Sequence, residues 1–306
     1  MKKLATLAGS LLGAACLFLF LRSAAKHWDA FQALSLDAAG VACVAASVVC
    51  YLGTHAASGA SWRLALRVFN ESIGYAHALR IVTLSQIGKY VPGNVGQHVG
   101  RVVLAQRAGI ATGHAVVSLA LESVLLLGGA ALCSLAAFDL LFDAARGHAL
   151  AIERNLSIAF GLGIVACVAL LLVPWSRRRL VHLAHRWLVL FSLRNFGLYA
   201  RILLLQACSF TLGAIALWLA VQAVSPVSLA MPASVLGVYA IAWLVGFLVP
   251  GAPAGLGIRE ALLVVGLSTL FGNDMAVLGT ALFRLVTLMG DGLAFLAGLA
   301  LSRLRD

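Results

Sequence analysis

The sequence has few charged residues, and this scarcity excludes most soluble proteins. Of its 306 residues only 11% are Asp, Glu, Lys or Arg, while 62% are hydrophobic and the mean hydropathy is +1.01. A composition of this kind leaves no room for a sizeable soluble domain and predicts an integral membrane protein. In such a protein the net charge of +11 points to basic loops that set membrane topology and not to nucleic acid.

The usual signals of metal, redox and nucleotide chemistry are also absent from the sequence. The six cysteines are scattered through apolar stretches, with no CxxC pair and no histidine at metal-ligand spacing. There is no P-loop and no recognisable Ser/His/Asp context. We therefore expect no metal, no cofactor and no enzymatic activity, and an ATP-driven pump is excluded for this chain alone. The cysteines are expected to be small packing residues, at Cys16, Cys43, Cys50, Cys133, Cys167 and Cys208.

Long apolar runs are what the sequence has in abundance. The first run follows Lys2 and Lys3 and predicts an uncleaved helix with its N-terminus inside, because it is longer than the core of a signal peptide. Residues 58 to 80, with several arginines and Trp62, predict an amphipathic helix on the inner leaflet. Six full membrane spans are predicted, at residues 4–21, 38–56, 114–138, 156–174, 202–224 and 276–301.

Basic residues indicate which side of the membrane each loop occupies. Five arginines lie between residues 177 and 194, directly after a predicted span, and Arg303 and Arg305 follow the last span. Since cytoplasmic loops carry an excess of Lys and Arg, both termini are predicted to be cytoplasmic. The expected location is the bacterial inner membrane, with the chain crossing it several times.

Two further apolar segments, residues 81–112 and 233–271, are interrupted by proline and glycine. The first contains VPGNVGQHVGR and the second VPGAPAGLGIRE. Proline removes a backbone donor and glycine tolerates open backbone, so each segment predicts two short helices that meet at a break. Irregular backbone at membrane depth must be covered by protein or by a water-filled cavity, which favours re-entrant hairpins. The predicted helix breaks are at Pro92, Gly93, Pro250 and Gly251.

The two breaks form an internal repeat. An arginine follows the proline at the same offset in both copies, since 101 − 92 = 9 and 259 − 250 = 9, and the copies are 250 − 92 = 158 residues apart. Matching interruptions in two halves are a pointer to the binding site of a transporter. We predict one membrane domain over residues 1–306, in which halves 1–138 and 155–306 form an inverted repeat. The fold class is all-α and polytopic, with about six full spans and two re-entrant hairpins that dip from opposite faces.

Arg101 and Arg259 are the strongest candidate site residues. Each follows a break, so its guanidinium and the amides of the second short helix could address one anionic group, and phosphate suits the planar fork of arginine. The alternative is that each arginine pairs with an acid, because a charge is costly to bury in a membrane. Acids are available for such pairs at Glu122, Glu260 and Asp291. The occurrence of the pattern in both halves favours the functional interpretation.

Other polar residues near the breaks extend the candidate headgroup site. Lys89, Asn94, Gln97 and His98 surround the first break, and Glu260 adjoins the second arginine. Lys89 could provide a second phosphate contact. Asn94 could equally cap the following helix, and for His98 a structural role is the favoured interpretation.

Three charged residues in the predicted spans leave two alternatives open. Glu122, Arg284 and Asp291 could couple transport to a proton or an ion, since a carboxylate at membrane depth can change its protonation during transport. A static ion pair, such as one between Arg284 and Asp291, explains them equally well.

The motifs resemble those of the family named after the transmembrane region of lysylphosphatidylglycerol synthase, whose members are described as flippase-like. The resemblance rests on QIGKYVPGNVGQHVGR at 86–101 and on VPGAPAGLGIRE at 249–260, and it spans essentially the whole chain. Members with synthase activity carry a soluble transferase domain as well, so lipid synthesis is not an expected activity here. The resemblance transfers a lipid-handling role to Lys89, Pro92, Asn94, Arg101, Pro250, Arg259 and Glu260.

Together these features predict a translocator that moves a lipid or a lipid-linked saccharide between leaflets and binds an anionic phosphate headgroup between its two hairpins. The alternative is a non-transporting accessory subunit that presents a polyprenyl-phosphate sugar to a glycosyltransferase partner. The other expected partner is the membrane lipid itself. A homodimer is an open alternative for the assembly.

Overall fold

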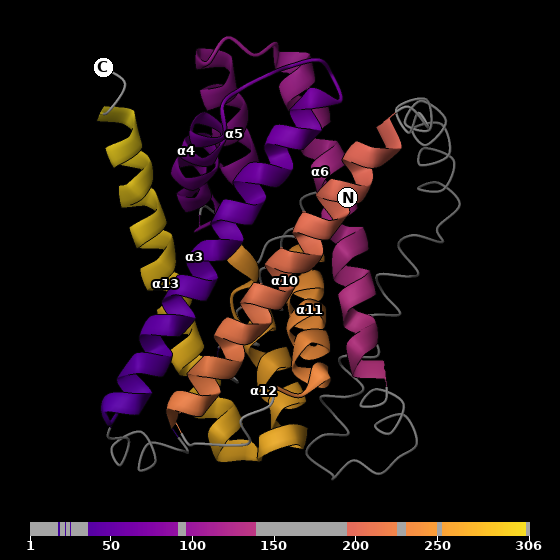
Figure 1. Cartoon of the computed structure of the whole chain (residues 1–306). Helices are drawn as coiled ribbons and strands as arrows, with labels where there is room; N and C mark the ends of the chain where they lie inside the picture. Colours follow the sequence, from indigo (N-terminus) through magenta and orange to yellow (C-terminus); the bar gives the residue numbers. More distant parts are fainter. Residues whose placement is uncertain are drawn as a thin grey trace.

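The computed structural model describes residues 36–90, 96–138, 195–224, 231–249 and 253–303, with three isolated residues before them. Within these ranges every regular element is a helix, which confirms the predicted all-α fold (Figure 1). Several predictions lie outside the described residues. They are the spans 4–21 and 156–174, the arginine-rich stretch 177–194, and the break residues Pro92, Gly93, Asn94, Pro250 and Gly251.

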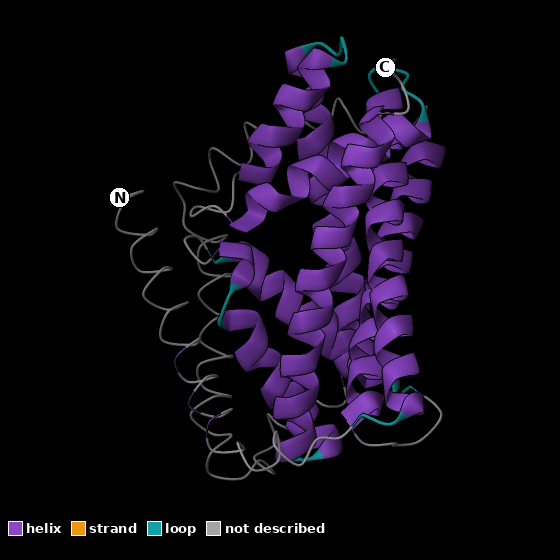
Figure 2. Ribbon diagram, turned by 90° about the vertical axis from the view of Figure 1, so that its left-hand side faces the viewer, coloured by secondary structure: helices purple, strands orange, loops and turns teal. Residues whose placement is uncertain are grey.

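Four long helices are apolar enough to cross a membrane, as predicted from the apolar runs. A helix of 30 residues is about 45 Å long, so each has ample length for the purpose. In Figures 1 and 2 these helices run along the length of the molecule. They are α3 (Ala38–Arg67), α6 (Thr112–Ser134), α10 (Phe196–Val224) and α13 (Asn273–Arg303).

The predicted interfacial helix at residues 58–80 is wrong, because α3 continues without interruption to Arg67. Trp62 and Leu66 are completely buried, and the indole Nε1 of Trp62 donates to Ser118 Oγ of α6 at 3.2 Å. The arginines nearby suggested a membrane surface, but the buried apolar face continues at helical spacing. The helix ends where Asn70 takes a left-handed conformation with φ of 59°.

Each interrupted segment contains two short helices, one on either side of the predicted break (Figure 1). In the first, α4 (Tyr75–Gln86) continues into the 3₁₀ turn η1 (Ile87–Tyr90), and α5 (Gly96–Arg107) returns beside them. In the second, α11 (Ala233–Leu248) is followed by the turn η4 (Pro253–Gly255) and α12 (Ile258–Phe271). Figure 1 shows the first hairpin toward one end of the molecule and the second toward the other.

Glycine lets the first hairpin close tightly. A methyl group built on Gly88 would lie 2.5 Å from the carbonyl carbon of Gly96, which is closer than any side chain permits. The backbones of η1 and α5 therefore touch where the chain reverses, and residues on both sides of the break are held close together.

The two halves are interlocked. Helices α3 and α10 run antiparallel along each other and form the most extensive helix contact in the described part of the chain (Figure 1). The first hairpin packs through α4 on α13, the last helix of the second half, and the second hairpin packs through α11 on α6 of the first half. Each hairpin is thus held by a long helix of the opposite half, and the turns η1 and η4 of the two hairpins are in contact.

Candidate functional site

A cavity of about 160 Å³ lies where the two hairpins meet between the long helices. Five of the residues predicted to bind the headgroup line it, together with Glu122. Lys89, Gln97, His98 and Arg101 come from the first hairpin, and Arg259 comes from the second. The structure therefore brings together residues from both copies of the sequence repeat.

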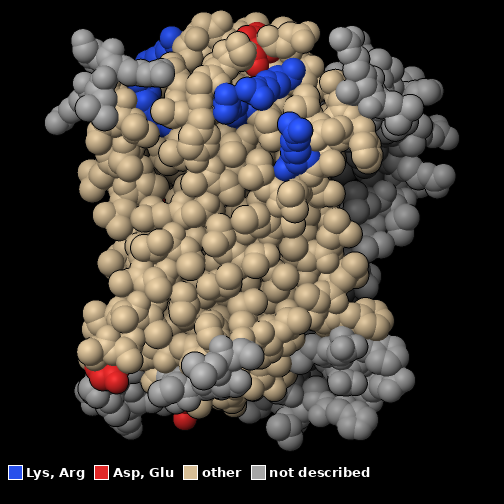
Figure 3. Space-filling model, viewed as in Figure 1, with Lys and Arg blue, Asp and Glu red and all other residues tan. Residues whose placement is uncertain are grey.

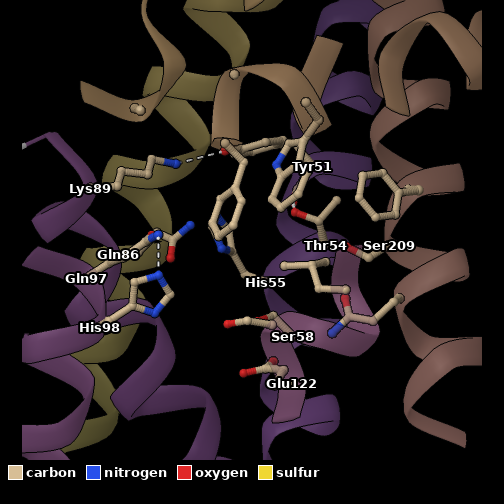
Figure 4. Close-up of a pocket in the computed structure, with 18 of the residues that line it drawn as sticks. Tyr51, Thr54, His55, Ser58, Gln86, Lys89, Gln97, His98, Glu122 and Ser209 are labelled. Carbon is tan, nitrogen blue, oxygen red and sulfur yellow. Dashed lines mark hydrogen bonds between the residues drawn. The ribbon is translucent and has the colours of Figure 1, made fainter. Parts of the chain in front are cut away.

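The polar lining comes from several elements (Figure 4). Lys89, Gln97 and His98 gather on one side of the cavity, across from Thr54 of α3 and Ser209 of α10. The side-chain nitrogen Nε2 of Gln97 lies 3.3 Å from His98 Nε2, so these two predicted residues are also partners of each other.

Arg101 has a carboxylate partner. Its Nη1 lies 2.7 Å from Glu122 Oε2, and both residues are buried. The guanidinium also lies 5.6 Å from the ring centre of Trp62. Of the two alternatives considered for the arginines, pairing with an acid is therefore the one that holds for Arg101. One donor remains, since Arg101 Nε is buried and has no hydrogen-bond partner among the described residues.

Arg259 has no ion-pair partner in the described part of the chain. Its side-chain stem lies against Gly246 and Gly255, with Cγ and Cδ both 3.0 Å from the position of a methyl group built on Gly255. These two glycines make room for the stem, and the head group reaches the cavity beside Tyr239. The arginine is half-buried and directed to the space between the hairpins.

The sequence offset of the repeat points to a residue near Arg259 that has no charge. The partner of Arg101 is Glu122, and the residue at the repeat offset of 158 from it is Thr280, since 280 − 122 = 158. Thr280 lines a second, smaller cavity together with Arg259. It offers a hydroxyl where the first half has a carboxylate, and that hydroxyl is buried without a hydrogen-bond partner among the described residues. The spacing that revealed the arginines could have revealed this substitution as well.

Asp291 of α13 is the centre of a buried polar network. Lys89 Nζ lies 2.7 Å from its carboxylate, the Tyr51 hydroxyl donates to it at 3.1 Å, and His55 Nε2 lies 3.2 Å away. The Tyr90 hydroxyl donates to the same carboxylate. The carboxylate of the second half is therefore surrounded by groups of the first. Sequence reasoning missed Tyr51 and His55, which belong to no motif, and Tyr90, which lies within the motif at 86–101.

The ion pair between Arg284 and Asp291, one of the two alternatives considered for these residues, is absent from the described part of the chain. These residues are seven positions apart on α13, which separates them by about 10 Å along the helix axis. Arg284 Nη1 lies instead 3.3 Å from Glu260 Oε1. The other oxygen of Glu260 accepts the backbone N–H of Gly257 at 2.7 Å and caps α12. Glu260 lines the smaller cavity, and each of its two carboxylate oxygens already has a partner within the protein.

Aromatic side chains of α10 and α11 form another part of the cavity lining. Trp243 and Phe247 are stacked with ring centres 5.0 Å apart, and Phe210 meets Trp243 edge to face at 5.3 Å. His98 reaches the edge of Phe247 at 6.5 Å. In the sequence these aromatics are indistinguishable from ordinary residues of an apolar helix.

Comparison with known protein families assigns the chain to one of them. The family described as the lysylphosphatidylglycerol synthase TM region matches residues 6–294. The chain belongs to this family. No curated protein matches it. As a member of the lysylphosphatidylglycerol synthase TM region family, the chain is a multi-pass integral membrane protein of lipid metabolism or translocation, and its cavity between two hairpins lies within the matched region.

Proposed function

We propose that the protein is a flippase-like translocator of a lipid or a lipid-linked saccharide, and that the phosphate of the headgroup binds between the two hairpins. The observation that carries this proposal is Arg259, which faces the cavity without a carboxylate partner in the described part of the chain. A half-buried cation at membrane depth is costly without a counterion, and an anionic ligand would supply the missing charge.

The surroundings of Arg259 suit a phosphate. Its planar fork can donate two parallel hydrogen bonds to phosphate oxygens. It occupies the first turn of α12, where the dipole of the helix adds positive potential. The free Nε donor of Arg101 belongs to the same cavity lining and offers a further contact from the other hairpin. A headgroup held in this way would touch both halves.

Contact with both halves is what a translocator requires. A site between two interlocked halves opens to either leaflet if one half rocks against the other, while the acyl or polyprenyl chains stay in the lipid. The face shown in Figure 3 has a broad uncharged band, with Lys and Arg gathered toward the end where α3 and α13 terminate. By the excess of basic residues on cytoplasmic surfaces, we propose that this end faces the cytoplasm of a bacterial inner membrane.

The test is leaflet exchange in proteoliposomes that contain only this protein. Fluorescent phosphatidylglycerol and a short polyprenyl-phosphate hexose are the probes, and Arg259→Ala is compared with Arg201→Ala, an exposed arginine of α10 that does not line the cavity. We expect the rate of lipid exchange to fall about 10- to 150-fold in the Arg259 variant and to be retained in the control. This factor corresponds to the loss of one charge-assisted hydrogen bond, which contributes roughly 1.5–3 kcal/mol.

Two outcomes would contradict the proposal, the first its headgroup site and the second its translocator function. Full lipid exchange by a folded Arg259→Ala protein would show that Arg259 is not the contact of the headgroup phosphate. Lipid binding that depends on Arg259 without any exchange would favour the accessory subunit that presents a polyprenyl-phosphate sugar to a glycosyltransferase.

A further inference from the structure

The charges around the cavity do not cancel. Among the described residues that line it or touch its lining, Lys89 is balanced by Asp291 and Arg101 by Glu122, each at 2.7 Å. Arg259 is the remaining charge, so the formal balance is one positive charge with histidines counted as neutral. The neighbouring pair of the smaller cavity also cancels, since its arginine and its glutamate lie 3.3 Å apart.

From this balance, we infer that the protein selects a lipid whose phosphate is a singly charged diester and whose headgroup beyond the phosphate is neutral and rich in hydroxyls, and that it discriminates against ammonium-bearing headgroups. The inference rests on the proposed translocator function and names its substrate class. Glycerol and hexose headgroups share this chemistry.

The single unbalanced cation sets the charge of the phosphate. In a site with little water, a ligand that leaves a net charge is bound less well than one that cancels it. A phosphodiester carries one negative charge and neutralises the positive charge of Arg259. A terminal phosphate group carries about −1.5 to −2 at pH 7 and would leave the occupied cavity with a net negative charge. The diester is therefore the better match.

An ammonium group finds no suitable partner in the described cavity. It has three donors and no acceptor, so it needs an anionic or strongly accepting neighbour. The carboxylate of Glu122 is held by Arg101, and that of Asp291 is held by Lys89, Tyr51 and Tyr90. A headgroup with a terminal amine would also bring a second positive charge near the guanidinium of Arg259, and the two like charges would repel each other.

Neutral hydroxyl groups, in contrast, have several partners. The amides of Gln97 and Gln206 and the hydroxyls of Ser58 and Ser209 line the cavity. Gln206 Nε2 already donates to Ser61 Oγ at 2.8 Å, but an amide keeps a carbonyl acceptor and a second N–H, and a hydroxyl both donates and accepts. The aromatic lining of α10 and α11 offers apolar ring faces on which the C–H face of a sugar could lie. Polar groups without charge beside aromatic rings suit a polyol.

A headgroup series tests the inference with the wild-type protein. Proteoliposomes receive labelled lipids with matched acyl chains bearing glycerol, ethanolamine or lysyl-glycerol phosphodiesters, and separately a polyprenyl-phosphate hexose. We expect the glycerol lipid, the hexose lipid or both to exchange at least about tenfold faster than the two amine-bearing lipids. The glycerol and hexose arms decide which polyol is preferred.

The failures are distinguishable. Equal or faster exchange of the ethanolamine or lysyl lipid would overturn the selectivity and leave the translocator function intact. No exchange of any lipid would overturn both.

A charge variant provides an independent measurement. Ser209→Asp places a carboxylate in the cavity lining, and Ser209→Asn is its neutral match in size. We expect Ser209→Asp to lower the preference for glycerol over ethanolamine by about tenfold or more, and Ser209→Asn to preserve it. An unchanged preference in a folded Ser209→Asp protein would contradict the inference. The wild-type headgroup series decides if this variant does not fold.

Discussion

Two arginines at equivalent positions of an internal repeat have different surroundings in this protein. Arg101 is buried and lies 2.7 Å from Glu122, whereas Arg259 faces the cavity with no carboxylate partner in the described ranges. At the offset of Glu122 the second half has Thr280. One substitution within a repeat can therefore separate a structural charge from a charge that is free to bind a ligand.

The comparison changes what each arginine is expected to do. Sequence reasoning treated the pair as equivalent contacts for one phosphate. The structure instead assigns the charge of Arg101 to a buried ion pair, with only its Nε donor unused. Loss of Arg101 should therefore affect folding first, and loss of Arg259 should affect ligand binding first.

The largest expected effect is the destabilisation caused by Arg101→Ala. Removing one member of a buried ion pair leaves the other charge uncompensated, which costs about 3–5 kcal/mol. The free energy of unfolding in detergent micelles should fall by this amount. Arg259→Ala breaks no ion pair in the described part of the chain, and it should change the same quantity by less than about 1 kcal/mol.

A double variant separates lost charge from lost packing. Arg101→Met with Glu122→Leu removes both charges and keeps apolar volume, so it should recover most of the stability that Arg101→Ala loses. If the double variant is as unstable as the single one, the ion pair is not the reason for the loss.

A second prediction gives Arg259 the partner that Arg101 has. Thr280→Glu places a carboxylate in the small cavity that Thr280 shares with Arg259, at the sequence offset of 158 from Glu122. The new pair should compete with the lipid phosphate and lower leaflet exchange about tenfold. Thr280→Gln has nearly the same size without the charge and should exchange lipid faster than Thr280→Glu. Equal losses in both variants would attribute the effect to volume.

The sequence was sufficient to predict much of the fold. Proline and glycine mark both hairpins because they break helices in any context, and long apolar runs mark α6, α10 and α13 because a membrane span needs about 20 apolar residues. The span predicted at 38–56 likewise lies in α3, but the second part of this helix was predicted wrongly because its arginines suggested a membrane surface. Only tertiary packing shows that Trp62 of this helix is buried against α6.

Which charged residues form ion pairs was harder to predict from the sequence than where the helices lie. Lys89 and Asp291 are distant in sequence and belong to different halves, so no local pattern connects them. Arg284 and Asp291 are close in sequence and yet too far apart along one helix to meet. The partner of a charge at membrane depth depends on which helices cross there, and this information is contained in the packing of the hairpins on the opposite half.

The smallest expected effect concerns the threonine itself. Thr280 Oγ1 is buried and has no hydrogen-bond partner among the described residues, and a buried polar atom without a partner costs free energy. Thr280→Val keeps the branched shape and removes that atom, so the free energy of unfolding should stay the same or rise by up to about 1 kcal/mol. Leaflet exchange should stay at the wild-type rate, because Arg259 gains no competing carboxylate. A loss of exchange in Thr280→Val comparable to that in Thr280→Glu would mean that the threonine hydroxyl takes part in transport, and that the second half has exchanged a structural acid for a working hydroxyl.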